Sequence, residues 1–242
     1  MTQDSRAARR ESDGWEVKAA SALRNAPAVT PDRDPPVLRR LGLVPYEPTW
    51  QAMGTFTDAR TAETRDELWL LEHPPVYTVG IAGRARHLPR AANAIPVVRT
   101  DRGGQITYHG PGQAVVYTLL DLQRLGIGVR SFVRLLEGAV IDLLADFDIA
   151  ARGRADAPGV YVGEAKIAAL GLRVRHGRCY HGLAFNVAMD LAPFDAIDPC
   201  GFPNLAVTSL ARLGVVRPVD AMADALAAAV CRRLALPGTQ ST

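Results

Sequence analysis

Lysine is almost missing from this chain of 242 residues. Only two of its 28 basic side chains are lysines, Lys18 and Lys166, and the rest are arginines. Arginine keeps its charge under ordinary conditions, whereas a lysine can lose its proton when it is buried. Lys166 is therefore either a leftover surface residue or a group whose neutral form is used, and composition leaves both interpretations open.

Cysteine is scarce as well. The three cysteines are odd in number and show no CxxC spacing, which supports neither a disulfide framework nor a zinc ribbon. Cys231 lies in an apolar helical run and Cys179 near a turn, and both positions suit small buried side chains. Cys200 stands between Pro199 and Gly201 in an irregular segment, so its surroundings are the ones that resemble a reactive site.

Long apolar runs and blocks of like charge are also absent. No run approaches the roughly 20 residues of a membrane span, and residues 1–36 contain no apolar core of a secretory signal. The net charge is only +3, and the basic residues are scattered. This does not favour a nucleic-acid partner. We expect a cytoplasmic protein without a membrane or nucleic-acid partner.

Hydrophobic periodicity predicts a single α/β domain over residues 37–242, preceded by a flexible extension over the polar, proline-broken residues 1–36. Helices are predicted at 49–63, 129–147 and 220–236, and strands at 37–44, 68–71, 76–79, 96–99, 114–117 and 159–162. Two further β runs, 166–175 and 178–187, flank His176-Gly177 and predict a hairpin. Because strands and helices are interspersed, we expect a mixed sheet flanked by helices.

The stretch from Arg102 to Gln113 is rich in glycine and lies between two apolar runs. Glycine lets the backbone adopt positive φ and lets a ligand approach closely, so this stretch is predicted to be a binding loop. It lacks the GxGxxG and GxxxxGK[ST] patterns, which argues against a nucleotide as its ligand.

Lys166 is predicted to lie on an apolar face of its strand. Regular alternation gives it the same face as Ala168, Leu170, Leu172 and Val174, unless a bulge at Gly171 changes the register. Burial there favours the neutral amine. Glu164 would share this side and raise the pKa of the lysine, whereas a turn at residues 163–165 would separate the two, and both arrangements remain open.

Five motifs, taken in order, resemble those of the bacterial lipoyl(octanoyl) transferases. They are Glu72-His73-Pro74-Pro75-Val76-Tyr77-Thr78, the whole stretch from Arg102 to Gln113, Lys166-Ile167-Ala168-Ala169-Leu170-Gly171, His181-Gly182-Leu183-Ala184-Phe185-Asn186 and Pro199-Cys200-Gly201. Each motif is weak alone, but five in order across residues 38–236 are specific. The family is related to the biotin and lipoate protein ligases. The resemblance therefore implies one α+β domain whose mixed, mostly antiparallel sheet is flanked by helices.

The resemblance also implies a reaction. Octanoyl, or lipoyl, passes from acyl carrier protein to a thioester on Cys200, and then to a lysine of a lipoyl domain. Lipoyl domains occur in 2-oxoacid dehydrogenase complexes and in the glycine cleavage H protein. Lys166 matches the lysine that lowers the pKa of the family's thiol and shuttles protons. No cofactor and no metal are implied.

The acyl-binding residues implied by the resemblance are Arg102, Gly103, Gly104, Gln105, Ile106, Thr107, Tyr108, His109, Ala169, Leu170, Gly171, Gly182, Leu183 and Ala184. Within this set, we interpret Tyr108 and Leu183 as walls of an apolar slot, with room left by the glycines. Backbone N–H groups near Leu170 and Gly171 are candidate donors to the thioester oxygen.

Two other functions are kept as alternatives. An ATP-dependent lipoate or biotin protein ligase of the same fold would activate a free acid and would not need Cys200. A non-catalytic module that binds acyl groups or carrier proteins would leave Lys166 and Cys200 idle. An arginine-rich loop, with Arg84, Arg86 and Arg90, could steer acidic partners if it lies beside the site, or it could be only a solvated loop.

Overall fold

A computed structural model of the chain describes residues 34–90, 94–203 and 205–235. The described residues belong to one compact α/β unit that begins at Asp34. The flexible extension is predicted over residues 1–36, and residues 1–33 of it lie outside the described part of the chain. No helix among the described residues is long and apolar enough to cross a membrane.

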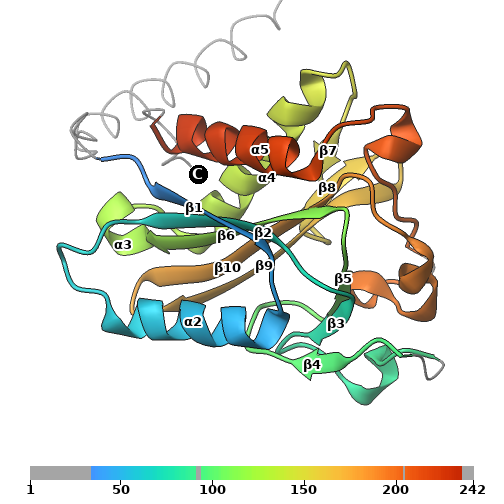
Figure 1. Cartoon of the computed structure of the whole chain (residues 1–242), viewed down its shortest axis with the longest axis horizontal. Helices are drawn as coiled ribbons and strands as arrows, with labels where there is room; N and C mark the ends of the chain where they lie inside the picture. Colours follow the sequence, from blue (N-terminus) through green and yellow to red (C-terminus); the bar gives the residue numbers. More distant parts are fainter. Residues whose placement is uncertain (1–33, 91–93, 204, 236–242) are drawn as a thin grey trace, which may run out of the picture. The chain divides into compact units, whose positions relative to one another are not determined.

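The main sheet has seven strands in the order β1-β2-β6-β10-β9-β8-β7 (Figure 1). They are β1 Val37–Leu43, β2 Glu67–Glu72, β6 Gln113–Asp121, β7 Arg152–Gly153, β8 Gly159–Val162, β9 Ala165–Arg175 and β10 Arg178–Asn186. Only β1 and β2 pair in parallel, and the other neighbours are antiparallel. The predicted mixed, mostly antiparallel sheet is confirmed.

Helices cover both faces of this sheet. In Figure 1, α4 (Val129–Ala145) and α5 (Val219–Ala235) lie on one face and α2 (Tyr46–Ala59) on the other, while the short α3 (Leu122–Leu125) follows β6. Side chains of β6 alternate between the two layers. Val116 and Leu120 pack toward α4 and α5, and Val115 and Tyr117 pack in the cluster with α2. Burial on both faces explains why this strand reads as one continuous apolar run.

The predicted hairpin is present between β9 and β10. Its two turn residues, His176 and Gly177, have φ angles of 48° and 76°. Two consecutive positive φ angles make the turn that matches the natural twist of a two-residue hairpin, and glycine meets the second at no steric cost.

The stretch from Arg102 to Gln113 is not one continuous loop, as its glycines suggested. Its middle forms β5 (Ile106–His109), which pairs with β3 (Val76–Val79), and β3 pairs in turn with β4 (Val97–Arg99) in a separate three-stranded sheet. Ile106 and Tyr108 bury into the cluster under this small sheet. Residues 106–109, between the glycines, thus have the alternating apolar side chains of a strand, and their pairing with β3 makes them one.

A bulge in β9 changes the predicted orientation of Lys166. Tyr161 pairs with Lys166 and Val160 with Ala168, so Ile167 is an extra residue on the β9 side. Ile167 and Ala168 both pack into the cluster under α4 and α5. The alternation predicted to run through Lys166 is therefore broken at Ile167 and not at Gly171, because a bulge sets two residues against one.

Glu164 does not lie against Lys166. A turn with Gly163 at φ 57° precedes β9, and the Glu164 side chain is 80% exposed and bonded to Arg152 at 2.5 Å. Of the two arrangements left open by the sequence, the turn is the one adopted.

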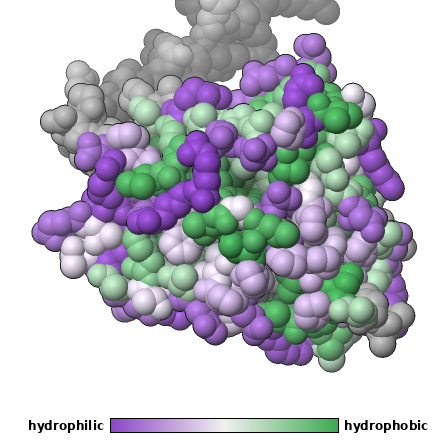
Figure 2. Space-filling view, in the orientation of Figure 1, coloured by the Kyte–Doolittle hydropathy of each residue, from purple (hydrophilic) through white to green (hydrophobic). Residues whose placement is uncertain are grey.

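The edge strand β1 carries exposed apolar side chains, Leu38, Leu41 and Leu43. Figure 2 shows apolar surface interrupted by polar side chains on the face where β1 runs in Figure 1. Two arginines interrupt the apolar sequence of this strand, and Arg39 bonds Glu67 while Arg40 bonds Asp224. Charged side chains on an edge strand discourage pairing with another chain.

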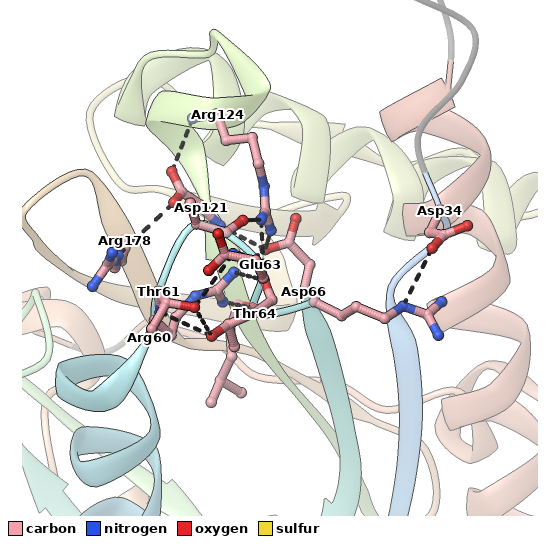
Figure 3. Close-up of polar contacts among 12 residues, drawn as sticks. Asp34, Arg60, Thr61, Glu63, Thr64, Asp66, Asp121, Arg124 and Arg178 are labelled. Carbon is pink, nitrogen blue, oxygen red and sulfur yellow. Dashed lines mark hydrogen bonds and ion pairs between the residues drawn. The ribbon is translucent and has the colours of Figure 1, made fainter.

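A buried ion-pair cluster ties α2 and β2 to the end of β6 (Figure 3). The Arg60 guanidinium is fully buried and donates to Asp66, and Arg124 Nη2 donates to the same carboxylate at 2.8 Å. Asp66 also accepts the N–H of Asp121 at 2.9 Å. The predicted helix over 49–63 stops at Ala59 because Arg60 turns to extended backbone, with its guanidinium meeting Asp66.

Replacing Asp66 with Asn should therefore destabilise the fold strongly. It leaves the buried Arg60 without a charged partner, a change that typically costs about 3–5 kcal/mol. Urea unfolding of both proteins measures the loss. The matched control is Asp34→Asn, whose partner Arg65 lies 3.8 Å away on the surface. That variant should stay within about 1 kcal/mol, and equal losses from the two variants would contradict this account.

Candidate active site

A pocket opens between the sheet and the segment that carries β5. The empty space there, including open solvent at the mouth, is about 500 Å³. Its lining comes from the first turn of α2, the 102–109 segment, β6, β9 and β10. The lining residues are Tyr46, Arg102, Gly104, Gln105, Ile106, Thr107, His109, Val115, Tyr117, Ala169, Leu170, Gly171, His181, Gly182, Leu183 and Ala184.

The structure gathers most of the predicted acyl-binding residues here. All of them line the pocket except Gly103 and Tyr108. Tyr108 is not a wall, because its ring packs on the other side of β5 against Tyr77 and Phe194. Gly103 instead donates its N–H to the carbonyl of Leu172 at 2.8 Å.

Four pocket residues were missed by sequence reasoning: Tyr46, Val115, Tyr117 and His181. Two-residue spacing puts Val115 and Tyr117 on one face of β6, which was a usable signal. No local pattern pointed to Tyr46, because it reaches the pocket through the packing of α2.

Arg102 holds the wall of the pocket together. Its guanidinium donates to the Thr78 carbonyl at 2.5 Å, to the Thr78 hydroxyl, and to the carbonyls of Gly103 and Gln105. The side chain is buried. The residue predicted to touch substrate thus also braces the turn between β4 and β5 against β3.

Two buried histidines beside the pocket have defined tautomers. His73 Nδ1 donates to the Val44 carbonyl at 2.6 Å, so Nε2 accepts from the Tyr117 hydroxyl at 2.7 Å. His109 Nδ1 donates to the Gln113 side-chain oxygen at 2.7 Å. Burial lowers the pKa of His73 to about 4 and that of His109 to about 3. Both rings are therefore neutral near pH 7.

A third buried histidine, His181, faces the pocket and is held by Asp101. Its Nε2 donates to the Asp101 carboxylate at 3.0 Å, while its Nδ1 is buried with no hydrogen-bond partner among the described residues. Burial by itself would raise the pKa of Asp101. Hydrogen bonds from His181, Tyr180 and Trp50 outweigh burial and hold that pKa well below its usual range. The carboxylate therefore stays charged and keeps the ring in one tautomer.

Lys166 is buried, with only 2% of its surface exposed. Its Nζ donates to the Pro158 carbonyl at 3.1 Å and lies 5.1 Å from the centre of the Tyr161 ring. The carboxylate on this side is Glu137 of α4, which accepts the N–H of Gly159 at 2.8 Å. Burial raises the pKa of Glu137, and the charge of Lys166 partly offsets that rise. Sequence reasoning missed Glu137 because its apolar helix gave no sign of a site.

The turn that contains Cys200 lies against the pocket rim. It is a 3₁₀ turn, η3 (Pro199–Gly201), in which Gly201 has φ 72°. A Cβ placed on Gly201 would lie 3.4 Å from the side chain of Gln105, a pocket residue, and 3.5 Å from His87 Nε2. The Cys200 side chain itself lies outside the described part of the structure.

The chain after this turn pairs with Lys166. Lys166 donates its N–H to the Ala206 carbonyl at 2.8 Å and accepts that of Thr208 at 2.9 Å. Before the turn, Arg90 bonds Asp198 at 2.6 Å. The turn that carries Cys200 is thus tethered on one side to Lys166 and on the other to the arginine-rich loop.

Arg90 also anchors the arginine-rich loop predicted from the sequence. Arg90 makes further hydrogen bonds to the carbonyls of Asp195 and Ile197, so the described end of this loop is anchored. Residues 91–93 and the side chain of Arg86 lie outside the described residues. Among the described residues, no three His, Cys, Asp or Glu side chains gather as metal ligands would.

Comparison with known proteins identifies the class. Residues 45–231 match the family model described as the lipoyl protein ligase A/B catalytic domain, and the chain belongs to this family. Two solved structures share the fold. A bipartite lipoate protein ligase from Thermoplasma acidophilum aligns with TM-score 0.65 and 18% identity over 84% of each chain. A biotin protein ligase from Aquifex aeolicus aligns with TM-score 0.55 and 13% identity over 82% of this chain and 70% of its own.

Curated relatives narrow the class to acyltransferases. An octanoyltransferase from Chromobacterium violaceum is 60% identical over 79% of this chain and 92% of its own length. One from Thiobacillus denitrificans is 61% identical over 84% of this chain and 95% of its own length. At this identity and coverage, the chain is an acyltransferase.

The neutral histidines make stability depend on pH. The pKa values of His73 and His109 in the fold lie below the ordinary value near 6.5, so the unfolded chain binds protons that the folded chain does not. The stability that the fold has while both rings are neutral is fully present above pH 6.5 and is lost as pH falls toward 4. We expect a loss of roughly 1–2 kcal/mol per histidine between pH 8 and pH 5, measured by urea unfolding.

His73→Gln tests the assignment, because an amide can donate to the Val44 carbonyl and accept from Tyr117 without titrating. This variant should lose less stability between the two pH values than the parent protein does. An unchanged pH dependence would show that His73 is not a source of it.

Proposed function

We propose that this acyltransferase moves an octanoyl group, or a lipoyl group, from acyl carrier protein to a lysine of a lipoyl domain through a thioester on Cys200. The observation that carries the proposal is the joining of the Cys200 turn to the buried Lys166 at one end of the pocket. Residues 37–242 form the catalytic domain in this proposal. The names of the relatives supply the acyl group.

In the first step, the Cys200 thiolate attacks the thioester of the carrier. A bond forms between the sulfur and the acyl carbon, and the carrier leaves as a thiolate that takes up a proton. Exchange between two thioesters is nearly balanced in energy, so no ATP is required. The thiolate is the nucleophile, and a nearby cation stabilises it. Lys166, held by Pro158 and Tyr161, supplies that cation and moves the proton.

In the second step, the neutral amine of the target lysine attacks the acyl-Cys200 thioester. The carbon–nitrogen bond forms as the carbon–sulfur bond breaks, and the proton shed by the amine returns to the sulfur through Lys166. The thioester oxygen needs donors as charge builds on it. The pairing of β8 with β9 reaches no farther than Ala169, opposite the first residue of β8, and beyond that point Gly103 donates to Leu172 on the same outer edge of β9. Leu170, two residues from Leu172, turns its N–H to the same edge and is our choice of donor.

The pocket suits an alkyl chain. Leu170, Leu183, Ala184 and Val115 line it, and the N–H groups of the neighbouring histidines His73 and His109 are engaged elsewhere. A chain lying along β9 and β10 therefore meets no unpaired donor from either ring. The other proposed contacts are Arg102, Gly104, Gln105, Ile106, Thr107, His109, Ala169, Gly171 and Gly182. Gly103 and Tyr108 support this set from behind.

The acidic partners expected of this reaction would meet the arginine-rich loop. Arg84 is exposed there, and Arg90 already pairs with Asp198. We assign Arg90 chiefly to holding the segment before the Cys200 turn, because its guanidinium is committed to three oxygen atoms of that segment. Any steering of the carrier would then fall more to Arg84.

Mixing the purified protein with octanoyl-acyl carrier protein in the absence of ATP tests the thioester. Intact-mass measurement should find one octanoyl adduct on the wild type and none on Cys200→Ala. The control is Cys231→Ala, which removes a half-buried thiol of α5 and should leave the adduct unchanged. Acylation that requires ATP and survives Cys200→Ala would indicate the ligase alternative. Absence of any acyl transfer would indicate a binding module.

Alkylation of Cys200 against pH tests the role of Lys166. A cation beside a thiol lowers its pKa, so Lys166→Met should slow iodoacetamide reaction near pH 7 by roughly tenfold, equivalent to one unit of thiol pKa. Cys179 provides an internal reference, because burial raises its pKa to about 12 and keeps it inert. Equal alkylation profiles for wild type and Lys166→Met would overturn the pairing.

A further inference from the structure

The pocket has a near end and a far end with respect to the proposed chemistry. Lys166 and Leu172 are six residues apart on β9, and because Ile167 is a bulge residue they span about five strand steps, roughly 17 Å. Ala169 lies on the Lys166 side of the pocket and pairs with Ala184, whereas Leu172 pairs with His181. His181 therefore lies at the end of the pocket that is farther along β9 from Lys166, whose backbone bonds the segment after the Cys200 turn.

The His181 ring is held firmly in place. Its Nε2 bonds Asp101 at 3.0 Å, and Asp101 also accepts from Trp50 at 2.8 Å and from Tyr180. The ring stacks on Tyr180 at 5.1 Å and meets the edge of Tyr117 at 6.1 Å. Side chains locked by packing and hydrogen bonds keep a site's shape when a ligand presses on it. The ring is thus a rigid part of the pocket wall.

The backbone at His181 is also unusual. Its φ is 62°, although it is not a glycine, and this turns His181 toward the same side of the sheet as Tyr180. Regular alternation would send these neighbours to opposite faces. Such conformations are strained and persist where the surroundings determine them. The conformation brings the imidazole into the pocket wall.

We propose that His181 is the floor of the acyl pocket and sets the longest acyl chain that the enzyme accepts. This rests on the proposed function, which puts the thioester at the Cys200 end. Seven C–C bonds of about 1.5 Å in a zigzag give an extended octanoyl group a length of about 9 Å. The strand from Ala169 to Leu172 covers about 10 Å. An eight-carbon chain with its carbonyl beside Ala169 therefore ends at His181, and a longer chain meets the ring.

Variants at this position must tolerate the positive φ. Asn and Gly do so, whereas most other residues would add backbone strain to the loss of the ring. His181→Asn shortens the floor, and His181→Gly removes it. Asp101 is a positioning residue here, because it acts on the acyl chain only through His181.

The test is a competition within one tube. Octanoyl- and decanoyl-acyl carrier protein are mixed at equal concentration with the enzyme, and the two adducts on Cys200 are measured by intact mass at early times. The ratio of adducts does not depend on how much of a variant is folded. A pocket typically discriminates one methylene by about 10–200-fold. We therefore expect the decanoyl-to-octanoyl ratio to rise at least tenfold in both variants over the wild type.

His176→Asn is the matched control. It makes the same substitution at another position with positive φ, in the turn between β9 and β10 and outside the pocket lining, and its ratio should stay near that of the wild type. Unchanged ratios in His181→Asn and His181→Gly, with octanoyl adducts still forming, would overturn the floor and leave the proposed function intact. No adduct on the wild-type protein would overturn both.

Discussion

The buried guanidinium of Arg102 is the interaction on which the pocket depends. One side chain donates to the backbone of β3 and to two carbonyls of the turn before β5. A buried carbonyl without a donor is costly, and a charged donor gives hydrogen bonds stronger than neutral ones do. Arg102 therefore holds the small sheet and the turn at Gly103 and Gly104 in one arrangement. Without these hydrogen bonds, the glycines would leave this wall of the pocket flexible.

The walls of the pocket combine polar groups with an apolar surface. Tyr117 donates its hydroxyl proton to His73, and both ring nitrogens of His109 are engaged by Gln113 and Thr78. These bonds turn the polar atoms away from the cavity and leave aromatic surface facing it. His181 is the exception, since its Nδ1 has no hydrogen-bond partner among the described residues. Because an alkyl chain makes no hydrogen bonds, the engaged polar groups of Tyr117, His73 and His109 suit such a ligand.

The two ends of the pocket are built by different means. At the Lys166 end, a bulge in β9, the carboxylate of Glu137 and the segment after the Cys200 turn come together around Lys166. At the other end, the kink at His181 turns its ring onto Asp101. Regular strands connect the two ends, so the spacing between them is set by the sheet and does not vary with the loops.

The sequence by itself determined the local pieces of this protein. Period-two runs and helical spacing located most elements, His176-Gly177 specified the hairpin, and the ordered motifs indicated the acyltransferase family. Only the tertiary structure decided how Lys166 is oriented, that Glu137 rather than Glu164 is its carboxylate neighbour, and that Tyr46 and His181 line the pocket. Those features depend on which strand pairs with which and on contacts between distant segments. A bulge or a buried pair has no signature in the residues of one strand, because its partner supplies half of the geometry.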